Sequence, residues 1–111
     1  VYDYPQDCKA FYMKLNPDQK TVACFDLLVP TVGELVGGSL RETCAEKLEN
    51  AMAKFSMKKC DYEWYLDLNR FGSASRGGFG LGFERLAQLI TNESNIRETA
   101  FIPRSYGNHI C

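Results

Sequence analysis

Hydrophobic and polar positions in the first third of the chain form short runs separated by turn residues. Residues 9–15 alternate loosely and are rich in aromatic side chains, and residues 21–29 form a second run that is nearly all apolar. Between the two runs, Asn16-Pro17-Asp18-Gln19 has the composition of a tight turn. The pattern predicts a β-hairpin whose second strand is covered on both faces.

Asp26 is an acid inside that apolar second run. A strand covered on both faces should be apolar throughout, so the position of this acid needs another explanation. Pro30 ends the run, and residues 33–41 predict another short strand. That strand contains Gly37-Gly38, where two missing side chains would let a ligand or another strand approach the backbone. We interpret the glycine pair as a point of access.

In the middle of the chain the spacing of apolar residues changes to that of a helix. Apolar side chains fall on one face and charged ones on the other, which predicts an amphipathic helix. The apolar face consists of Cys44, Leu48, Ala51, Met52 and Phe55. Residues 61–68 predict a short helix that ends before Gly72. Its aromatic side chains are expected to pack inward, and they are Tyr62, Trp64 and Tyr65.

A glycine-rich strand over residues 77–82 is predicted to run directly into a further helix. The helical spacing there comes from Phe83, Leu86, Ala87 and Ile90. Strands come first, helices lie between and after them, and the connections are hairpins rather than crossovers. This order favours an α+β fold, with an antiparallel sheet flanked by helices, over a doubly wound fold.

Composition limits the size and class of the protein. With 111 residues the chain is one domain at most, and 45% hydrophobic with 24% charged residues is typical of a chain that folds. The net charge of −1 neither indicates nor excludes binding to RNA. The longest apolar run, residues 25–30, is far shorter than the roughly 20 residues of a membrane span. We expect no membrane crossing and read no targeting peptide at Val1.

The five cysteines are odd in number, contain no Cys-x-x-Cys pair and accompany a single histidine, His109. A zinc site and a disulfide framework are therefore not expected. Reduced cysteines indicate an intracellular compartment, with Cys24 and Cys44 as core residues. We expect His109 to be a solvated tail residue rather than a catalytic group.

The segment Gly80-Leu81-Gly82-Phe83-Glu84-Arg85 combines glycines on a strand with an arginine at the start of a helix. Glycines would let a flat base lie against the backbone, and a helix N-terminus with a guanidinium favours phosphate oxygens. Position 83 is Phe where a dinucleotide-binding motif needs Gly, and Gly-Lys-Ser/Thr does not occur, which excludes Rossmann and P-loop sites. The segment indicates nucleotide binding or, equally, a strand packed under a helix with Arg85 in a surface ion pair.

Asp26 and Glu34 lie on neighbouring predicted strands, and Arg41 follows on the second of them. Two carboxylates side by side repel each other unless a cation lies between them, and Mg²⁺ bridging to nucleotide phosphates would relieve that repulsion. A metal–nucleotide site would explain the acid in the apolar run. The alternative is that Asp26 points to a sheet edge or pairs with a lysine, while Arg41 forms a salt bridge with Glu34 or Glu42.

Residues 80–86, Gly-Leu-Gly-Phe-Glu-Arg-Leu, resemble motif 3 of the class II aminoacyl-tRNA synthetases. Residues 29–42, Trp64-Tyr65-Leu66-Asp67-Leu68 and residues 9–13 resemble segments specific to the asparaginyl enzymes, in the family's order. The resemblance implies that residues 1–111 are the C-terminal part of a class II catalytic domain. Its reaction would be ATP-dependent activation of asparagine to an adenylate, followed by transfer to tRNA(Asn).

The resemblance also assigns residues to the nucleotide. By position, Arg85 would bind the γ-phosphate of ATP and is the residue expected to be catalytic. Gly82, Phe83 and Glu84 would form the adjoining wall of the nucleotide site. Catalysis in such a site would rest on positioning and charge neutralisation, which needs no histidine.

The remaining assignments concern the metal and the amino acid. Glu34 would bind ATP through Mg²⁺, assisted by Asp26. Arg41 would face the side chain of the amino acid and donate to the amide oxygen of asparagine.

The chain departs from the usual family pattern at several positions. Asn69 stands where Arg is usual, and Arg76 stands where His or Cys is usual. Residues 41–44 and 98–104 also differ. These changes bear on contacts with the tRNA end and the substrate more than on nucleotide binding. Ser39-Leu40-Arg41 and the divergent end resemble the mitochondrial branch more than the cytosolic one.

Motif 1, motif 2 and the anticodon-binding barrel of such an enzyme would precede Val1. We therefore expect a longer, homodimeric parent enzyme, located in mitochondria or cytoplasm, and a fragment without activity of its own. Two alternatives stay open at this point. One is a synthetase-like protein that binds or regulates without catalysis, and the other is an aspartyl-type relative, which residues 64–68 disfavour.

Overall fold

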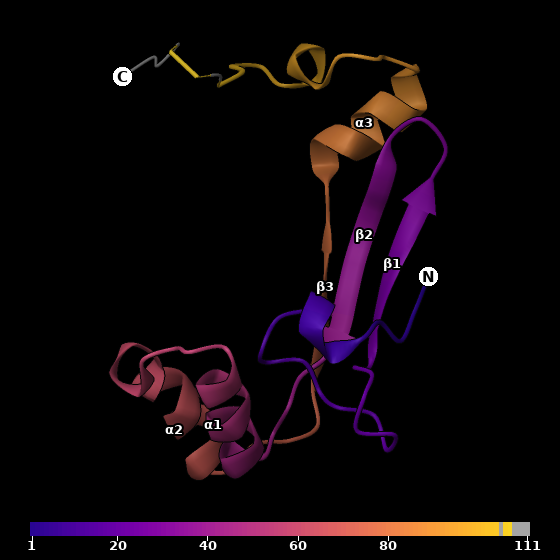
Figure 1. Cartoon of the computed structure of the whole chain (residues 1–111). Coiled ribbons are helices and arrows are strands. Elements are labelled where there is room, and N and C mark those ends of the chain that lie inside the picture. The colour runs from indigo at the N-terminus through magenta and orange to yellow at the C-terminus, as the bar shows by residue number, and fades with distance from the viewer. Residues whose placement is uncertain (105, 108–111) are drawn as a thin grey trace. The chain divides into compact units, whose positions relative to one another are not determined.

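The computed structural model describes residues 1–104, 106 and 107 of the chain (Figure 1). The predictions of a solvated His109 and a reduced Cys111 concern residues outside this described part of the chain. Over the described part of the chain, no helix is long and apolar enough to cross a lipid bilayer.

The chain forms two compact units. The first combines residues 1–25 with 38–79, and the second combines residues 26–37 with the chain from residue 80 onward. The helices of the first unit are α1 (Ala45–Lys54), α2 (Glu63–Arg70) and the short 3₁₀ helices η1 (Gln6–Cys8) and η2 (Lys59–Tyr62). The second unit holds α3 (Phe83–Thr91) and the 3₁₀ helix η3 (Ile96–Thr99).

Three strands hydrogen-bond in the order β1-β2-β3, with bounds β1 (Cys24–Val29), β2 (Gly33–Leu40) and β3 (Gly77–Leu81). A tight turn at residues 30–32 joins β1 to β2, which lie side by side (Figure 1). Gly33, which follows the turn, has φ +83°, a left-handed conformation that glycine adopts without steric strain.

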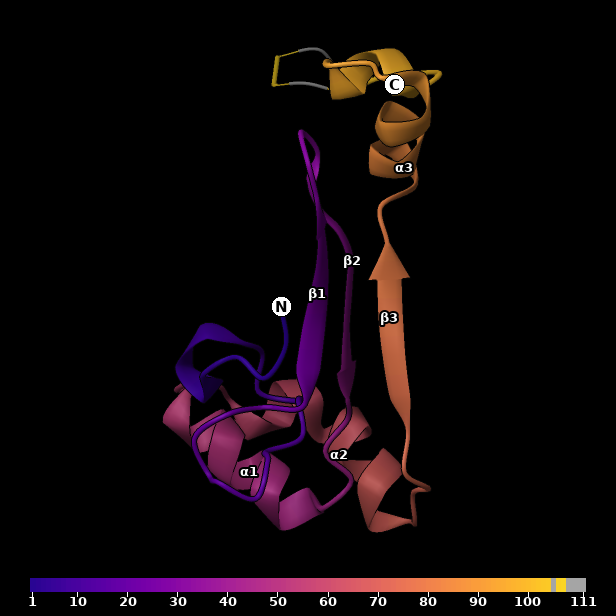
Figure 2. The same cartoon turned by 90° about the vertical axis from the view of Figure 1, so that its right-hand side faces the viewer.

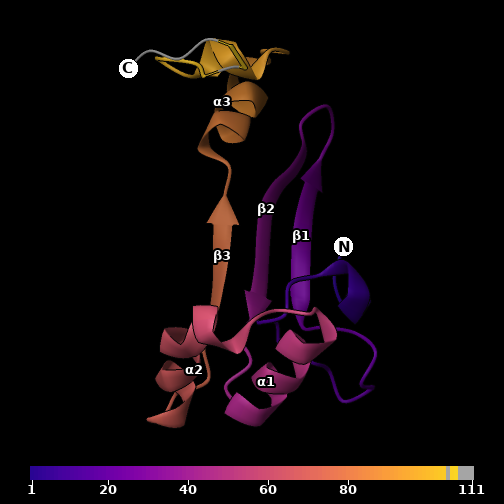
Figure 3. The same cartoon turned by 60° about the vertical axis from the view of Figure 1, so that its left-hand side comes forward.

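β2 and β3 are antiparallel. The Arg41 N–H donates to the Arg76 carbonyl at 2.9 Å, and the Gly82 N–H donates to the Leu35 carbonyl at 3.0 Å. Residue numbers therefore increase along β3 while those of their hydrogen-bond partners along β2 decrease, which defines an antiparallel pair. The two arrows point in opposite directions in Figure 3. The predicted antiparallel α+β fold is confirmed.

The strand predicted over residues 9–15 is wrong. The backbone of this segment forms isolated β-bridges, such as Leu15 with Val22, and no regular strand. Adjacent side chains of a strand point to opposite faces, but Phe11 and Tyr12 both pack against the same helical core. The regular hairpin of the chain is β1-β2 instead.

The turn predicted at residues 16–19 is confirmed. Asp18 Oδ1 accepts the backbone N–H groups of Thr21 and Lys20 at 3.0 Å each. These bonds favour the ionised carboxylate, so they hold the pKa of Asp18 below its usual value.

The core of the first unit lies between α1 and α2 and is made by Leu48, Met52 and Leu66, each at most 2% exposed. Figure 2 shows the two helices side by side. The predicted amphipathic helix and the helix that ends before Gly72 are both confirmed. Trp64 was expected to pack inward, but its side chain is 66% exposed, because it lies on the face of α2 opposite Leu66.

Burial alternates over the first four residues of β1, and Leu28 farther along is exposed as well, so the prediction of a strand covered on both faces is wrong. Cys24 and Asp26 are buried, whereas Phe25 and Leu27 are exposed. β1 lies at the edge of the three-stranded sheet, and successive side chains of a strand point to opposite faces. The acid therefore occupies the sheltered face and the apolar residues the open one.

The cysteine predictions have a mixed outcome. Cys24 is buried, as predicted, but Cys44 is only half-buried and occupies the N-cap of α1. No described side chain caps α1, and Glu42 instead binds the backbone that leads into the helix, where its Oε1 accepts the N–H groups of Thr43 and Cys44 at 3.0 Å each. This explains why the carboxylate of Glu42 is buried.

Glu49 on α1 ties the two helices together on their surface. Its Oε2 accepts from Lys59 Nζ at 2.9 Å, and its Oε1 accepts from Arg70 at 2.8 Å. The Lys59 ammonium and then the Arg70 guanidinium hold the pKa of Glu49 below its ordinary value.

Replacing Leu66 by Ala should destabilise the protein that contains this chain by about 2–5 kcal/mol, because a fully buried methyl pair leaves a cavity. Leu68→Ala on the same helix is the matched control, since that side chain is 53% exposed. Denaturant melts of both variants measure the difference. Equal losses of stability would show that α2 does not bury Leu66.

Glu49 should contribute to stability in a pH-dependent way. Its folded pKa lies below the ordinary value of 4.5, so its contribution is complete above pH 4.5 and is lost as pH falls through the folded pKa. In thermal melts against pH, Glu49→Gln should melt below the unchanged protein at neutral pH, and the gap should close in acid. A gap that is constant with pH would contradict the charge pairing.

Candidate functional site

Two carboxylates converge above Gly37 in the second unit. A Cβ atom placed on Gly37 would lie 2.7 Å from Glu34 Oε1 and 3.3 Å from Asp26 Oδ1. Asp26 is 8% exposed, whereas Glu34 is exposed. The acid in the apolar run is thus brought together with Glu34, as predicted, and the missing side chain of Gly37 makes room for both.

Arg85 lies beside this pair. Its Nη1 donates to the backbone carbonyl of Glu34 in a very short hydrogen bond. The aliphatic part of Arg85 covers Gly82, whose added Cβ would lie 3.3 Å from Arg85 Cδ. The surface ion pair considered for Arg85 is therefore not what holds it, because a backbone carbonyl accepts instead.

The start of α3 is fixed to the sheet by backbone bonds. The Gly82 N–H donates to the Leu35 carbonyl at 3.0 Å, and the Leu86 N–H donates to the Gly82 carbonyl at 2.8 Å. Phe83 is 71% exposed, and Glu84 is exposed beside it. The predicted strand-to-helix junction is confirmed, and it presents these side chains to solvent at the N-terminal end of a helix.

The second unit thus gathers two carboxylates, one guanidinium and a helix N-terminus. Positive groups at a helix N-terminus suit phosphate oxygens, and Mg²⁺ is commonly held by one or two carboxylates together with those oxygens. Among the described residues, no group of three or more His, Cys, Asp or Glu could hold a metal ion by itself. The pair above Gly37 supplies two carboxylates and, within the described part of the chain, no further side-chain ligand of these types.

Arg41 lies at the end of β2, and its surroundings belong to the first unit. Its Nη1 donates to Ser39 Oγ at 2.6 Å, and its Cζ lies 4.7 Å from the centre of the Tyr12 ring. An added Cβ on Gly78 would lie 3.2 Å from Arg41 Nη2. Arg41 thus donates to a serine and packs on a ring, in place of the salt bridge to Glu34 or Glu42 that the sequence left open.

The neighbours of Arg41 that the sequence did not reveal are Ser39, Gly78 and Tyr12. The spacing of Ser39 and Arg41, two apart on one strand, puts both on the same face and could have revealed that contact. Tyr12 comes from a segment that was wrongly predicted to be a strand. The contact between Tyr12 and Arg41 could therefore not be predicted from the pattern of hydrophobic and polar residues.

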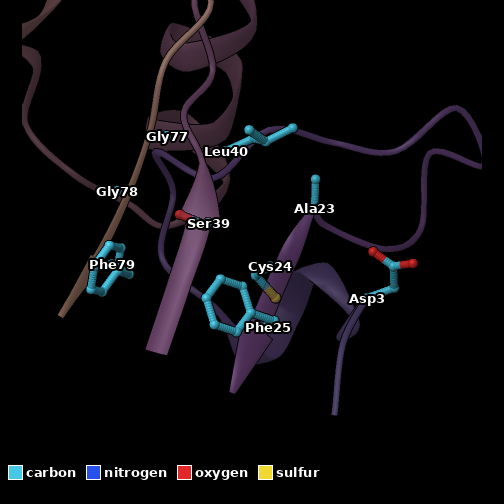
Figure 4. A pocket seen from close by; sticks show the side chains of 9 residues that line it. All are labelled: Asp3, Ala23, Cys24, Phe25, Ser39, Leu40, Gly77, Gly78 and Phe79. Carbon is cyan, nitrogen blue, oxygen red and sulfur yellow. The ribbon is translucent and has the colours of Figure 1, made fainter. Parts of the chain in front are cut away.

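A cavity of about 400 Å³ opens over the part of the sheet that belongs to the first unit (Figure 4). Phe25 and Phe79 flank it from β1 and β3, and Leu40 lies at one end. Its walls are mostly apolar, and an added Cβ on Gly38 would lie 2.6 Å from the Phe25 ring. The access predicted at Gly38 is therefore taken up by an aromatic ring of the chain itself.

Comparison with known proteins decides the family. The family model of the class II tRNA synthetases (D, K and N) matches residues 1–106. The chain belongs to this family. This confirms the resemblance drawn from motif 3 and the partial class II synthetase fold.

Individual members of the class II tRNA synthetases are similar to nearly the whole chain. The asparagine–tRNA ligase of Desulfitobacterium hafniense (strain Y51) is 55% identical over 97% of the chain, and that of Acetivibrio thermocellus is 58% identical over 95%. The asparaginyl-tRNA synthetase of Pyrococcus horikoshii, solved with asparaginyl-adenylate, matches 98% of the chain with a TM-score of 0.94 and 45% identity.

The chain is much shorter than these synthetases. It spans 23% of the length of each of the two bacterial ligases and 26% of the length of the solved chain. The residues above Gly37 and around Arg41 therefore correspond to about a quarter of the length of these relatives.

Proposed function

We propose that this chain is the C-terminal part of the catalytic domain of an asparagine–tRNA ligase. In the proposed reaction the carboxylate of asparagine attacks the α-phosphorus of ATP, which forms asparaginyl-adenylate and releases pyrophosphate. The terminal ribose hydroxyl of tRNA(Asn) then attacks the acyl carbon and releases AMP. The observation that carries this proposal is the close match, at 45% identity, to a synthetase solved with asparaginyl-adenylate.

Arg85 is the proposed ligand of the γ-phosphate of ATP. Its hydrogen bond to the Glu34 carbonyl restricts the side chain, and its exposed position leaves further N–H donors for phosphate oxygens. Gly82, Phe83 and Glu84 form the proposed wall beside it. Gly82 suits this role because the side chain of Arg85 lies where a Cβ would crowd it.

Glu34 and Asp26 are the proposed ligands of Mg²⁺. Their oxygens lie within 3.3 Å of one point above Gly37, a donor set of two carboxylates that fits this ion. Bound Mg²⁺ would neutralise charge on the phosphate oxygens of ATP. The chain's own contribution is to hold the two carboxylates together against their repulsion.

Arg41 is the proposed reader of the asparagine side chain. A guanidinium can donate to the amide oxygen, and the missing side chain of Gly78 makes room for its Nη2. Together with Arg85 it would act by positioning and by charge, without proton transfer from a histidine.

The proposal also includes the missing motifs, the oligomeric state and the location of the whole enzyme. Motifs 1 and 2 would come from the remainder of the protein, and motif 1 would form a homodimer. The location in mitochondria or cytoplasm stays a prediction from Ser39-Leu40-Arg41 and the divergent end of the sequence.

Exchange of pyrophosphate into ATP by the full-length parent enzyme tests the proposal. Exchange should require asparagine and should be absent with aspartate. Arg85→Ala should abolish it, since removal of an essential charged group at the phosphate lowers the rate by roughly a hundredfold or more. Arg97→Ala, an exposed arginine of η3, is the matched control.

Each result of that assay separates one alternative. Exchange with aspartate would assign the parent to the aspartyl enzymes, and no exchange at all would favour a non-catalytic synthetase-like protein. Normal exchange in Arg85→Ala would refute the assignment of that residue to ATP.

Gly37→Ala should raise the KM for Mg·ATP while the protein stays folded. The added Cβ would overlap Glu34 Oε1, which is the mobile end of an exposed side chain, so the carboxylate moves and the strand persists. We expect a rise of roughly tenfold, as for the loss of one charged contact. The KM from exchange kinetics, measured beside a melting curve, checks this, and an unchanged KM would argue against a shared site above Gly37.

A further inference from the structure

We propose that Ser39 and Tyr12 are positioning residues that aim the guanidinium of Arg41 at the amino acid, with Gly78 leaving room for the guanidinium itself. This inference rests on the proposed function, in which Arg41 reads asparagine. It extends that function to three residues whose contacts with Arg41 come from the structure and not from the sequence motifs.

Ser39 fixes one side of the guanidinium. The 2.6 Å hydrogen bond from Arg41 Nη1 uses one of the five N–H donors and sets the plane of the group. Ser39 is only 6% exposed, so its hydroxyl is sheltered from competing water. A buried acceptor at this distance holds the arginine in one rotamer, leaving other donors for a ligand.

Tyr12 fixes the face of the guanidinium. The ring lies 4.7 Å from Arg41 Cζ, within the range of a cation–π contact. The ring cannot move freely, because it packs edge-to-face on Phe11 with centroids 5.5 Å apart. Phe11 in turn packs on Tyr62 and Tyr65, which belong to the aromatic margin of the α1–α2 core. The core thus determines where the Arg41 side chain lies.

Backbone bonds fix the two segments on which these side chains stand. The Glu42 N–H donates to the Tyr12 carbonyl at 2.9 Å, and the Arg41 N–H donates to the Arg76 carbonyl at 2.9 Å. Tyr12 and Arg41 therefore stay in register, and Gly78 on the paired strand lies beside Arg41 Nη2. The guanidinium thus has support on two sides and lies against Gly78 on a third.

Such support lowers the entropy that a flexible arginine loses when it binds a ligand. Removing either support should therefore weaken asparagine binding without changing the contacts of ATP. In the full-length parent enzyme, Ser39→Ala and Tyr12→Leu should each raise the KM for asparagine by about tenfold. The KM for ATP should stay within about twofold, because the ATP contacts are made elsewhere.

Conservative variants and matched controls separate positioning from other roles. Tyr12→Phe keeps the ring face and should retain a KM close to that of the unchanged enzyme. Ser75→Ala removes an exposed serine, and Tyr2→Leu removes a tyrosine that is 76% exposed, so both should leave the KM for asparagine unchanged. Melting curves for all variants show whether the fold is kept.

The outcomes are distinct. An unchanged KM for asparagine in Ser39→Ala and Tyr12→Leu, in an enzyme that exchanges normally, would overturn this assignment alone. A loss in Tyr12→Phe as large as in Tyr12→Leu would show that the hydroxyl contacts the substrate directly, which would also overturn the positioning role. If the unchanged parent enzyme shows no asparagine-dependent exchange, the proposed function fails and this inference fails with it.

Discussion

The absence of side chains at Gly37 and Gly78 is the constraint on which the charged group of each unit depends. Above Gly37, two carboxylate oxygens occupy the volume that a Cβ would need. Beside Gly78, the Arg41 guanidinium lies within 3.2 Å of the position of a Cβ. Glycine weakens a strand by conformational entropy and by the loss of packing, so its use at these positions exchanges some strand stability for room over the backbone.

That room would be useless if the charged groups were free to move, and each is held by a different kind of support. Arg85 donates to a backbone carbonyl on β2, and backbone bonds join Gly82 to that strand, so the strand and the start of α3 hold Arg85 together. Arg41 relies on a serine hydroxyl and an aromatic ring, which trace back to the helical core of the first unit. Rigid elements thus set the aim of flexible side chains.

The amphipathic helix and the helix after the glycine-rich strand could be predicted because their apolar residues recur at helical spacing. The convergence of Asp26 and Glu34 could be predicted as well, since an acid inside an apolar run requires a partner. The strand over residues 9–15 was predicted wrongly. A loosely alternating aromatic segment can also form an irregular loop whose adjacent aromatic rings both pack against the same core. Trp64 shows the same limit, since hydrophobicity alone does not tell which face of a short helix is buried.

If Arg41 binds the amino acid as proposed, its environment bears on which amino acid is recognised. A carboxylate attracts a guanidinium by charge over several ångströms, so an imprecisely held arginine still finds it. An amide oxygen offers only a hydrogen bond, which weakens steeply when distance and angle are poor. Recognition of a neutral side chain by an arginine therefore depends more on aim than recognition of an acid does. The supports at Ser39 and Tyr12 supply that aim, which is why we attach them to the reading of asparagine.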